Sequence, residues 1–299
     1  MIRFFTAIKY IFIDLRMDKL FTIGQLIGRW LVRILVAYAV ICSLAITIGL
    51  VAAYRYVMAP INEIKALAAS NPVESAYMAA YREDLRRQNK PDTLTHLFVP
   101  LDSISKNLQN AVIAAEDDGF WVHPGFNIDA MVRAYAYNVQ SGKIKRGGST
   151  ITQQLVKNLF LDTDKNFERK YKEMAYTLLV EKFLGKKRIL ELYLNYAQWG
   201  PSLFGCEAAA QLYFKKPASQ LSRYEAIRMA ALLASPERKN PFYEKSTFLS
   251  SRIQVIANNL YIHHIIDDTG YRNITGAPPP NDSTHADSSQ AQTDTSSIE

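Results

Sequence analysis

A run of 21 uncharged residues near the N-terminus, residues 34–54, limits the possible folds of this 299-residue chain more than any other feature. The run is rich in Val, Ile, Leu and Ala. As a helix, with a rise of about 1.5 Å per residue, it would cross the roughly 30 Å hydrocarbon core of a lipid bilayer. We therefore predict a transmembrane helix over residues 34–57. A cleaved signal peptide is the alternative, although the apolar core of a signal peptide is normally shorter and begins nearer the terminus.

Charged residues on the two sides of this run predict its orientation. Six basic and two acidic residues precede the run, whereas Arg55 is the one charged residue that follows closely. Because basic residues are retained on the cytoplasmic side, we expect residues 1–33 to be cytoplasmic and the rest of the chain to lie outside the cytoplasm. Residues 1–28 mix apolar and basic side chains, so this segment either lies along the inner membrane surface or forms a loosely ordered tail.

Net charge and cysteine content exclude some classes of site and leave several classes of partner open. The formal net charge of +7 favours an anionic partner, which is a nucleic acid, a phospholipid head group or a phosphorylated substrate. Cys42 and Cys206 are the two cysteines of the sequence, and Cys42 lies in the apolar run. Neither a disulfide framework nor a cysteine-rich metal site is therefore expected.

Composition divides the chain beyond the apolar run into three segments. Residues 58–102 are polar and contain Pro60 and Pro91, so we predict a linker with one or two short helices. Residues 103–266 carry apolar side chains at helical spacing and no sustained strand alternation, which predicts a mainly α domain. Residues 267–299 are predicted to be a disordered tail, because apolar residues almost vanish from Gly276 onward.

Two helices of the predicted domain have an apolar stripe that we expect to be buried. In the helix that begins at residue 151, the stripe consists of Ile151, Leu155 and Leu159. In the following helix, it consists of Phe167, Tyr171, Met174 and Leu178. Both stripes recur every three or four residues, as one face of a helix does.

A pair of acidic residues, Glu116 and Asp117, stands where a predicted helix ends. Acidic side chains at a helix C-terminus oppose the helix dipole, so helix stability does not explain their position. The neighbouring Phe120 and Trp121 can raise the pKa of a carboxyl group and suit it to proton transfer. Solvated residues at a helix end are the alternative. His123 has no second histidine nearby and is more typical of a structural hydrogen bond than of a metal ligand.

A glycine-rich turn, residues 147–150, precedes the next predicted helix. Thr150 and Gln153 form the Thr-x-x-Gln pattern of a capping box, which predicts that a helix begins there. The free N–H groups of its first turn lie close in sequence to Lys145 and Arg146, so this turn is a candidate anion site. Any capped helix after glycines has a similar pattern, so the motif alone is weak.

A charged segment, residues 169–173, lies on the helix that follows. Its cations suit an anionic ligand, and Glu173 is a second candidate acid. Charged pairs four residues apart also occur on many surface helices, so this segment alone does not establish a site.

Together these stretches resemble glycosyltransferase family 51, the peptidoglycan glycosyltransferases. Five ordered family motifs are matched by Glu116, Asp117, Phe120, His123 and Gly125; by residues 147–158; by Arg169, Lys170 and Glu173; by residues 189–195; and by Gly205 with residues 207–214. The resemblance covers residues 103–241, and no transpeptidase motif follows. The chain is therefore similar to the monofunctional branch, the biosynthetic transglycosylases of Gram-negative bacteria.

The resemblance implies a lysozyme-like, mainly α fold and polymerisation of lipid II into β-1,4-linked glycan strands, with release of undecaprenyl pyrophosphate. Glu116 matches the general base that deprotonates the acceptor 4-hydroxyl group, and Glu173 matches the acid that assists the leaving pyrophosphate. The residues that match substrate-binding positions are Asp117, His123, Ser149, Thr150, Gln153, Lys157, Asn158, Lys165, Arg169, Lys170 and Lys172. Lys165 stands where many relatives have arginine, which keeps the charge and loses bidentate phosphate geometry.

The resemblance also implies how a metal and the two acids are arranged. A divalent cation, Mg²⁺ or Mn²⁺, would be bridged by the substrate pyrophosphate, with Glu173 as a possible ligand and no dedicated protein cage. We expect the carboxylates of Glu116 and Glu173 to face one groove, with the helix start at Thr150 between or beside them.

The implied location is the bacterial inner membrane, with one membrane pass and a periplasmic catalytic domain. The implied partners are the membrane, lipid II, the nascent glycan strand, and a penicillin-binding transpeptidase or proteins of cell division or elongation; no nucleic acid is expected. A lytic enzyme of the same lysozyme-like fold is one alternative. An inactive, membrane-anchored cell-wall scaffold is the other.

Overall fold

The computed structural model describes residues 2–142, 147–161, 167–237, 240–242 and 246–280. The chain forms two compact units, Met1–Ala59 and Pro60–Glu299. We describe each unit by itself.

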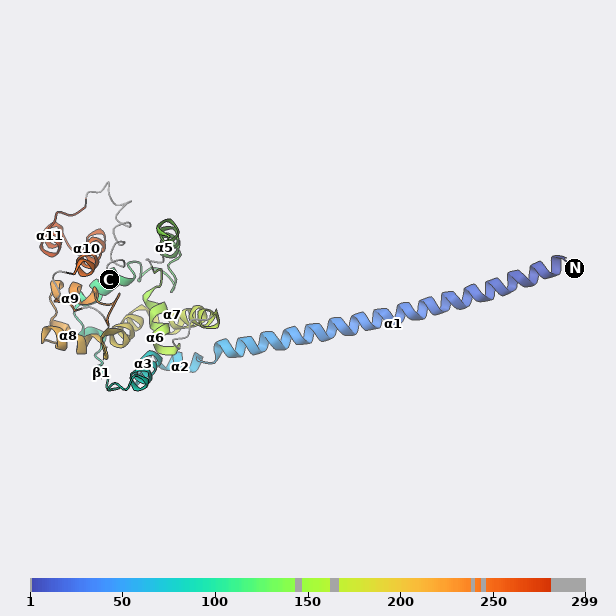
Figure 1. Cartoon of the computed structure of the whole chain (residues 1–299), viewed down its shortest axis with the longest axis horizontal. Helices are drawn as coiled ribbons and strands as arrows, with labels where there is room; N and C mark the ends of the chain where they lie inside the picture. The colour runs from blue at the N-terminus through green and yellow to red at the C-terminus, as the bar shows by residue number, and fades with distance from the viewer. Residues whose placement is uncertain (1, 143–146, 162–166, 238–239, 243–245, 281–299) are drawn as a thin grey trace. The chain divides into compact units, whose positions relative to one another are not determined.

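The first unit is a single helix, α1 (Ile2–Met58) (Figure 1). From Gln25 onward it is long and apolar enough to cross a membrane. Large apolar side chains are exposed all along this stretch, as at Leu35, which is 65% exposed. A helix that is apolar on all sides suits a lipid environment, and α1 therefore fits the predicted membrane anchor. The backbone is helical from Ile2 onward.

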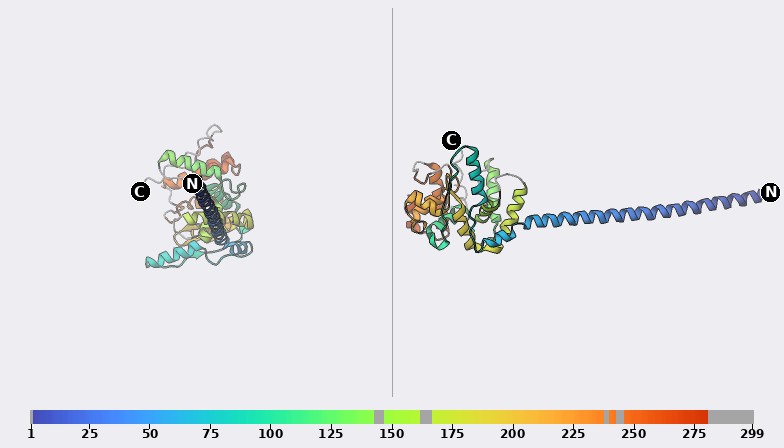
Figure 2. Two further views of the ribbon diagram at one scale, coloured as in Figure 1. Left: turned by 90° about the vertical axis from the view of Figure 1, so that its right-hand side faces the viewer. Right: turned by 90° about the horizontal axis from the view of Figure 1, so that it is seen from below.

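The second unit is built almost entirely from helices with short connections (Figures 1 and 2). Its α-helices are α2 (Ile61–Ala66), α3 (Ala76–Arg87), α4 (Lys106–Glu116), α5 (Ile128–Ser141), α6 (Ile151–Phe160), α7 (Phe167–Tyr196), α8 (Cys206–Phe214), α9 (Arg223–Ala230), α10 (Thr247–Ile262) and α11 (Asp268–Thr275). A small sheet in the order β1-β3-β2 joins β1 (Thr95–His96), β3 (Leu203–Phe204) and β2 (Gln198–Gly200). The predicted mainly α class is confirmed.

Helix α6 lies in the core of this unit, packed against α7, while α4 packs against α9 and α10. The predicted burial of the α6 stripe is confirmed, since Ile151 and Leu155 are fully buried and Leu159 is 7% exposed. The predicted capping box is also present, because Thr150 and Gln153 each bond the other's backbone N–H group. A local sequence pattern therefore sets the start of the central helix.

Helix α7 contradicts the buried stripe predicted for it. The apolar side chains of Phe167, Tyr171, Met174 and Leu178 are all exposed, by 47% to 87%. The face that packs on α6 carries Glu173, Tyr176, Thr177 and Val180 instead. The prediction was wrong because the polar and aromatic side chains of this second face find partners inside the protein, which periodicity alone does not reveal. Glu173 therefore lies in the interior of the second unit.

Residues 58–102 contain the two short helices α2 and α3, as predicted, but most of the segment belongs to the folded unit, so its description as a linker is wrong. Helix α2 packs against α7 and α3 packs against α6. The carbonyl oxygen of Leu67 accepts a 2.8 Å hydrogen bond from Nε of Arg188. Strand β1 pairs in parallel with β3, with Thr95 opposite Leu203. Helix packing and hydrogen bonds to distant segments hold this polar stretch of the chain in the folded unit. Composition alone does not indicate such contacts.

The predicted tail over residues 267–299 begins with a helix, α11, so the disorder prediction is wrong for its first part. Asp267 caps α11 by accepting a 2.8 Å hydrogen bond from the backbone N–H of Gly270. Tyr271 is 2% exposed and packs against Tyr261 of α10. The buried Tyr271 holds this segment against α10, and the Asp267 cap fixes the start of α11. Residues 281–299 lie outside the described residues.

Candidate active site

Glu116 is the last residue of α4, and two side chains from other helices hold its carboxylate. Oε2 accepts a 2.9 Å hydrogen bond from Nε2 of Gln154, on α6. Oε1 accepts a 3.0 Å hydrogen bond from Nη2 of Arg252, on α10. The side chain keeps 13% of its surface exposed. Glu116 is therefore fixed in orientation while part of it remains accessible.

Helix α10 also satisfies the backbone at this end of α4. Nη2 of Arg252 lies 3.1 Å from the carbonyl oxygen of Ala115, and Nδ2 of Asn259 lies 2.7 Å from that of Ala114. The last carbonyl groups of a helix have no partner within the helix, so these donors replace missing bonds. The Arg252 guanidinium also offsets the unfavourable position of an acid at a helix C-terminus. Sequence reasoning missed Arg252, which stands 136 residues from Glu116.

Glu173 lies on the buried face of α7 and is 2% exposed. Its Oε1 accepts hydrogen bonds from Nε2 of Gln153 at 3.2 Å and from Nζ of Lys170 at 2.7 Å. Lys170 is half exposed. A buried carboxylate is thus joined to a cation at the surface.

Two consecutive residues of α6, Gln153 and Gln154, bring the two acids together. The amide oxygen of Gln153 accepts from the backbone N–H of Thr150, and that of Gln154 accepts from the hydroxyl of Tyr193. Each amide oxygen is therefore occupied, so each NH₂ group is left to face a glutamate. Successive side chains of a helix point about 100° apart, which lets neighbouring residues reach different acids. The structure thus places Glu116 and Glu173 beside the same turn, just after Thr150.

Lys157, one turn beyond Gln153, lies within the electrostatic influence of both acids. Burial lowers the pKa of the Lys157 ammonium, and the cations Lys170 and Arg169 act in the same direction. The carboxylates of Glu173 and Glu116 oppose this shift. Lys157 is therefore a half-buried cation in the region that joins the two carboxylates.

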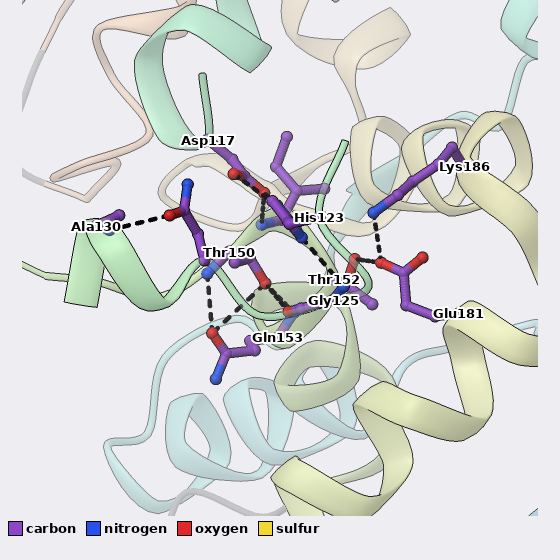
Figure 3. Close-up of polar contacts among 11 residues, drawn as sticks. Asp117, His123, Gly125, Ala130, Thr150, Thr152, Gln153, Glu181 and Lys186 are labelled. Carbon is purple, nitrogen blue, oxygen red and sulfur yellow. Dashed lines mark hydrogen bonds and ion pairs between the residues drawn. The ribbon is translucent and has the colours of Figure 1, made fainter. Parts of the chain in front are cut away.

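Asp117 and His123 form a buried pair behind the start of α6 (Figure 3). Oδ2 of Asp117 accepts a 3.0 Å hydrogen bond from the backbone N–H of Ile151. The Gly125 N–H donates to Nδ1 of His123, so the neutral ring carries its proton on Nε2 and donates it to Asp117 at 2.9 Å. Burial raises the pKa of the Asp117 carboxyl, opposed by the Ile151 and His123 hydrogen bonds.

The hydroxyl of Thr150 completes this frame by donating a 2.7 Å hydrogen bond to the carbonyl oxygen of Gly125. Gly125 has φ of +98°, and a Cβ at this position would lie 2.8 Å from Thr177. A glycine is therefore required where the turn passes α7. Asp117 and His123, both expected to touch substrate, bond each other instead. Thr150, expected to do the same, bonds Gly125 and Gln153, and the three side chains thus position the start of α6.

A second, part-buried network, which the sequence did not reveal, joins α6 to the two halves of α7 (Figure 3). Glu181 accepts hydrogen bonds from the hydroxyl of Thr152 and from Nζ of Lys186. Lys186 follows Gly185, whose φ of 71° and ψ of 160° interrupt α7. The network fastens both halves of α7 to the first turn of α6.

The remaining predicted site residues flank this centre. Ser149 and Asn158 are half-buried, the first just before α6 and the second on it. Arg169 is half-buried on the first turn of α7, where Nζ of Lys172 bonds Glu168 at 3.0 Å. Lys165 lies outside the described residues, as do Lys145 and Arg146 of the predicted anion site. Within the described part of the chain, no group of three or more His, Cys, Asp or Glu side chains could hold a metal ion.

Comparison with known proteins places this site in a family. The family model named Transglycosylase matches residues 83–261. A biosynthetic peptidoglycan transglycosylase from Ralstonia nicotianae is 42% identical over 236 residues, which cover 78% of this chain and 96% of that protein. The protein of the same name from Nitrosospira multiformis is 46% identical over 182 residues, 59% of this chain and 79% of that protein. The family model covers more than half of the sequence and includes both glutamates, and the chain therefore belongs to the transglycosylase family.

Proposed function

We propose that this enzyme polymerises lipid II into β-1,4-linked glycan strands and releases undecaprenyl pyrophosphate. The observation that carries the proposal is the pairing of two acids with one turn of α6, Glu116 through Gln154 and Glu173 through Gln153. The relatives named biosynthetic peptidoglycan transglycosylases support the same reaction class.

In the proposed reaction, Glu116 is the general base. Its carboxylate takes the proton of the 4-hydroxyl group on the N-acetylglucosamine of the acceptor lipid II. The acceptor oxygen forms a bond to the anomeric carbon of the growing strand, and the bond from that carbon to the pyrophosphate breaks with inversion. Gln154 and Arg252 hold the carboxylate so that its remaining exposed edge can meet the hydroxyl group.

The leaving pyrophosphate carries the electron pair of the broken bond and needs positive charge around it. Lys157 on α6 and the basic residues of the first turns of α7, Arg169, Lys170 and Lys172, supply this charge. Glu173 positions Lys170 through their 2.7 Å ion pair and, as a second acid, assists departure directly or through a cation. The basic cluster and Glu173 thus form the proposed pyrophosphate side of the site.

A divalent cation fits this site only as a bridge. Glu173 offers one carboxylate, so the other ligands of Mg²⁺ or Mn²⁺ would be pyrophosphate oxygens and water. When bound, the cation would neutralise charge on the leaving group.

We place the enzyme at the bacterial inner membrane, with α1 as its anchor, the N-terminus in the cytoplasm and the second unit in the periplasm. The basic residues before the apolar run support this orientation. The exposed apolar face of α7 suits a domain that works at a lipid surface. A penicillin-binding transpeptidase, or a protein of division or elongation, remains the predicted partner.

Purified full-length protein in detergent, given lipid II and Mg²⁺, should convert the precursor into glycan strands detectable by gel electrophoresis. Chelation of the divalent cation should slow the reaction. Release of soluble muropeptides from purified cell wall would favour a lytic enzyme instead. Failure to consume lipid II across several metals and detergents would favour an inactive scaffold.

Replacing Arg252 by Gln should lower kcat for polymerisation 10- to 100-fold, because a hydrogen bond to a charged group is worth about 1.5–3 kcal/mol. Arg252→Lys should recover part of the rate, since it keeps the charge but its ammonium does not reproduce the position of Nη2, which bonds both Glu116 and Ala115. Arg87→Gln, at a cation whose side chain is 75% exposed on α3, is the control. Initial rates and thermal unfolding should be measured together. A wild-type kcat in a folded Arg252→Gln enzyme would show that Arg252 has no role in the reaction.

A further inference from the structure

The hydroxyl of Tyr193 is a buried polar group that connects the core of the second unit to the proposed base. Tyr193 lies in the second half of α7, after the break at Gly185, and is 2% exposed. Leu192 and Leu194 on either side of it are fully buried. The Tyr193 hydroxyl donates a 3.0 Å hydrogen bond to Oε1 of Gln154 on α6. A buried tyrosine hydroxyl usually needs a hydrogen-bond partner, and the Gln154 amide serves as one.

The side chain of Gln154 stands between two groups that determine which way its amide points. The ionised carboxylate of Glu116 can only accept hydrogen bonds, so it faces the NH₂ group, at 2.9 Å. The amide oxygen is left for the Tyr193 hydroxyl, which donates to it. The opposite orientation would set the amide oxygen against a carboxylate oxygen with no proton between them. Because a glutamine side chain loses much rotamer freedom when it is fixed, a contact on each side of the amide helps to hold one conformation.

Tyr193 remains a hydrogen-bond donor at physiological pH. Burial raises the pKa of the Tyr193 hydroxyl well above its ordinary value, and the nearby Glu116 carboxylate acts in the same direction. Arg252 opposes this shift, and Asp117 adds to it. The phenol therefore stays protonated, and its proton is available to Gln154.

We propose that Tyr193 is a positioning residue for the reaction, whose hydroxyl fixes the Gln154 amide and through it the Glu116 carboxylate. The proposal rests on the proposed role of Glu116 as the general base. A base must hold its accepting oxygen within hydrogen-bond reach of the acceptor hydroxyl group, and a small displacement costs rate. Gln154 holds one carboxylate oxygen and Arg252 the other. Loss of the Tyr193 hydroxyl would loosen the first of these two supports.

Two other roles for Tyr193 fit less well. Direct proton transfer to the substrate conflicts with its burial and with the raised pKa of its hydroxyl. Packing alone does not require the hydroxyl, because phenylalanine would fill nearly the same space without a polar group to satisfy. Orientation of the Gln154 amide explains both the hydroxyl and its direction.

Replacing Tyr193 by Phe should lower kcat for polymerisation of lipid II roughly tenfold, with little change in KM, because the hydroxyl acts on the base and not on substrate binding. The matched control is Tyr271→Phe. Tyr271 is also 2% exposed, and its hydroxyl donates a 2.6 Å hydrogen bond to the side-chain amide oxygen of Asn258. The control should polymerise at the wild-type rate. Thermal unfolding of both full-length variants in detergent shows whether they are folded, and an equal loss of kcat in the two would contradict the proposal.

A double-mutant cycle tests whether Tyr193 acts through Gln154. Gln154→Leu removes the amide with little change in size and should itself lower kcat. If the hydroxyl acts through the amide, adding Tyr193→Phe to Gln154→Leu should cause no further loss of rate. Losses that multiply would show that the hydroxyl acts independently of Gln154 and would overturn the proposal.

An NMR measurement tests the orientation of the amide without turnover. In isotope-labelled full-length protein, the side-chain NH₂ signals of Gln154 are identified by their loss in Gln154→Leu. The proton bonded to Glu116 should lie downfield of its position in a free glutamine, and this shift should shrink in Tyr193→Phe but persist in Tyr271→Phe. An unchanged Gln154 signal in a folded Tyr193→Phe protein would sink the proposal even if the rate fell. So would a wild-type signal at the position of a free glutamine, a result that needs no variant at Tyr193.

The spectrum and the rate together separate this inference from the proposed function. A Gln154 signal that responds to Tyr193→Phe, in a protein that does not polymerise lipid II, would refute the proposed function and keep the orienting contact. Polymerisation at the wild-type rate by Tyr193→Phe would do the opposite.

Discussion

Replacing Glu116 by Gln should reduce polymerisation of lipid II by roughly 10³-fold, within the range expected for loss of a general base. The amide has nearly the size of the carboxylate and cannot take the proton of the acceptor hydroxyl group. Its oxygen can satisfy only one of the two donors at this position, Gln154 or Arg252, because the other would face the amide NH₂. The loss should appear in kcat, with little change in KM, because the proton is transferred only in the transition state.

Two further variants separate the chemical role of Glu116 from its contacts. Glu116→Asp keeps the carboxylate and withdraws it by one methylene, so it should retain more activity than Glu116→Gln. Glu83→Gln makes the same acid-to-amide change on the exposed face of α3 and should polymerise at the wild-type rate. Robust strand synthesis by a folded Glu116→Gln enzyme would show that another group accepts the proton.

The parts of the fold that sequence predicted correctly are those set by residues close together in the chain. Thr150 and Gln153 are three residues apart, so their reciprocal capping could be read directly from the pattern. The apolar run of α1 needs no partner within the protein to identify it. Each of these features depends on local chemistry.

The parts that sequence did not predict depend on which distant segments meet. The exposed stripe of α7 has a helical period as regular as a buried one, and only the packing of α6 on the opposite face decides between them. The pairing of β1 with β3 joins residues about a hundred positions apart. A helical period identifies the apolar face of a helix but does not identify the element that packs against that face.

The same distinction holds within the active site. Family resemblance predicted Glu116 and Glu173 as the two acids, but not how they are held. Gln153 and Gln154 are adjacent in sequence and serve different acids, which becomes clear only when Tyr193 and Thr150 are seen to occupy their amide oxygens. Arg252 lies on a helix with no motif, so nothing near it in the sequence marked it as a partner of Glu116.

Replacing Glu173 by Gln should lower kcat by roughly 10²-fold, within the range measured when one group that stabilises transition-state charge is removed. Glu173 is buried, and Gln153 and Lys170 both donate to its Oε1 atom, so an amide oxygen at that position could accept both hydrogen bonds but would lack the negative charge that pairs with Lys170. The variant also makes the site more positive. If only the net charge of the site mattered, the added positive charge should attract the leaving pyrophosphate more strongly and the rate should not fall. A loss of rate would therefore show that Glu173 acts by positioning a cation.

A titration with Mg²⁺ distinguishes the two ways in which Glu173 can act. If its carboxylate binds the divalent cation, the Glu173→Gln enzyme should need a higher Mg²⁺ concentration and recover part of its rate there. If it acts by holding Lys170, Lys170→Gln should reproduce the defect, and the Mg²⁺ requirement should not change. The control is Glu168→Gln, one turn earlier on α7, at a side chain that is 60% exposed and paired with Lys172. Equal rates for the Glu168 and Glu173 variants would mean that burial beside α6 gives Glu173 no role in the reaction.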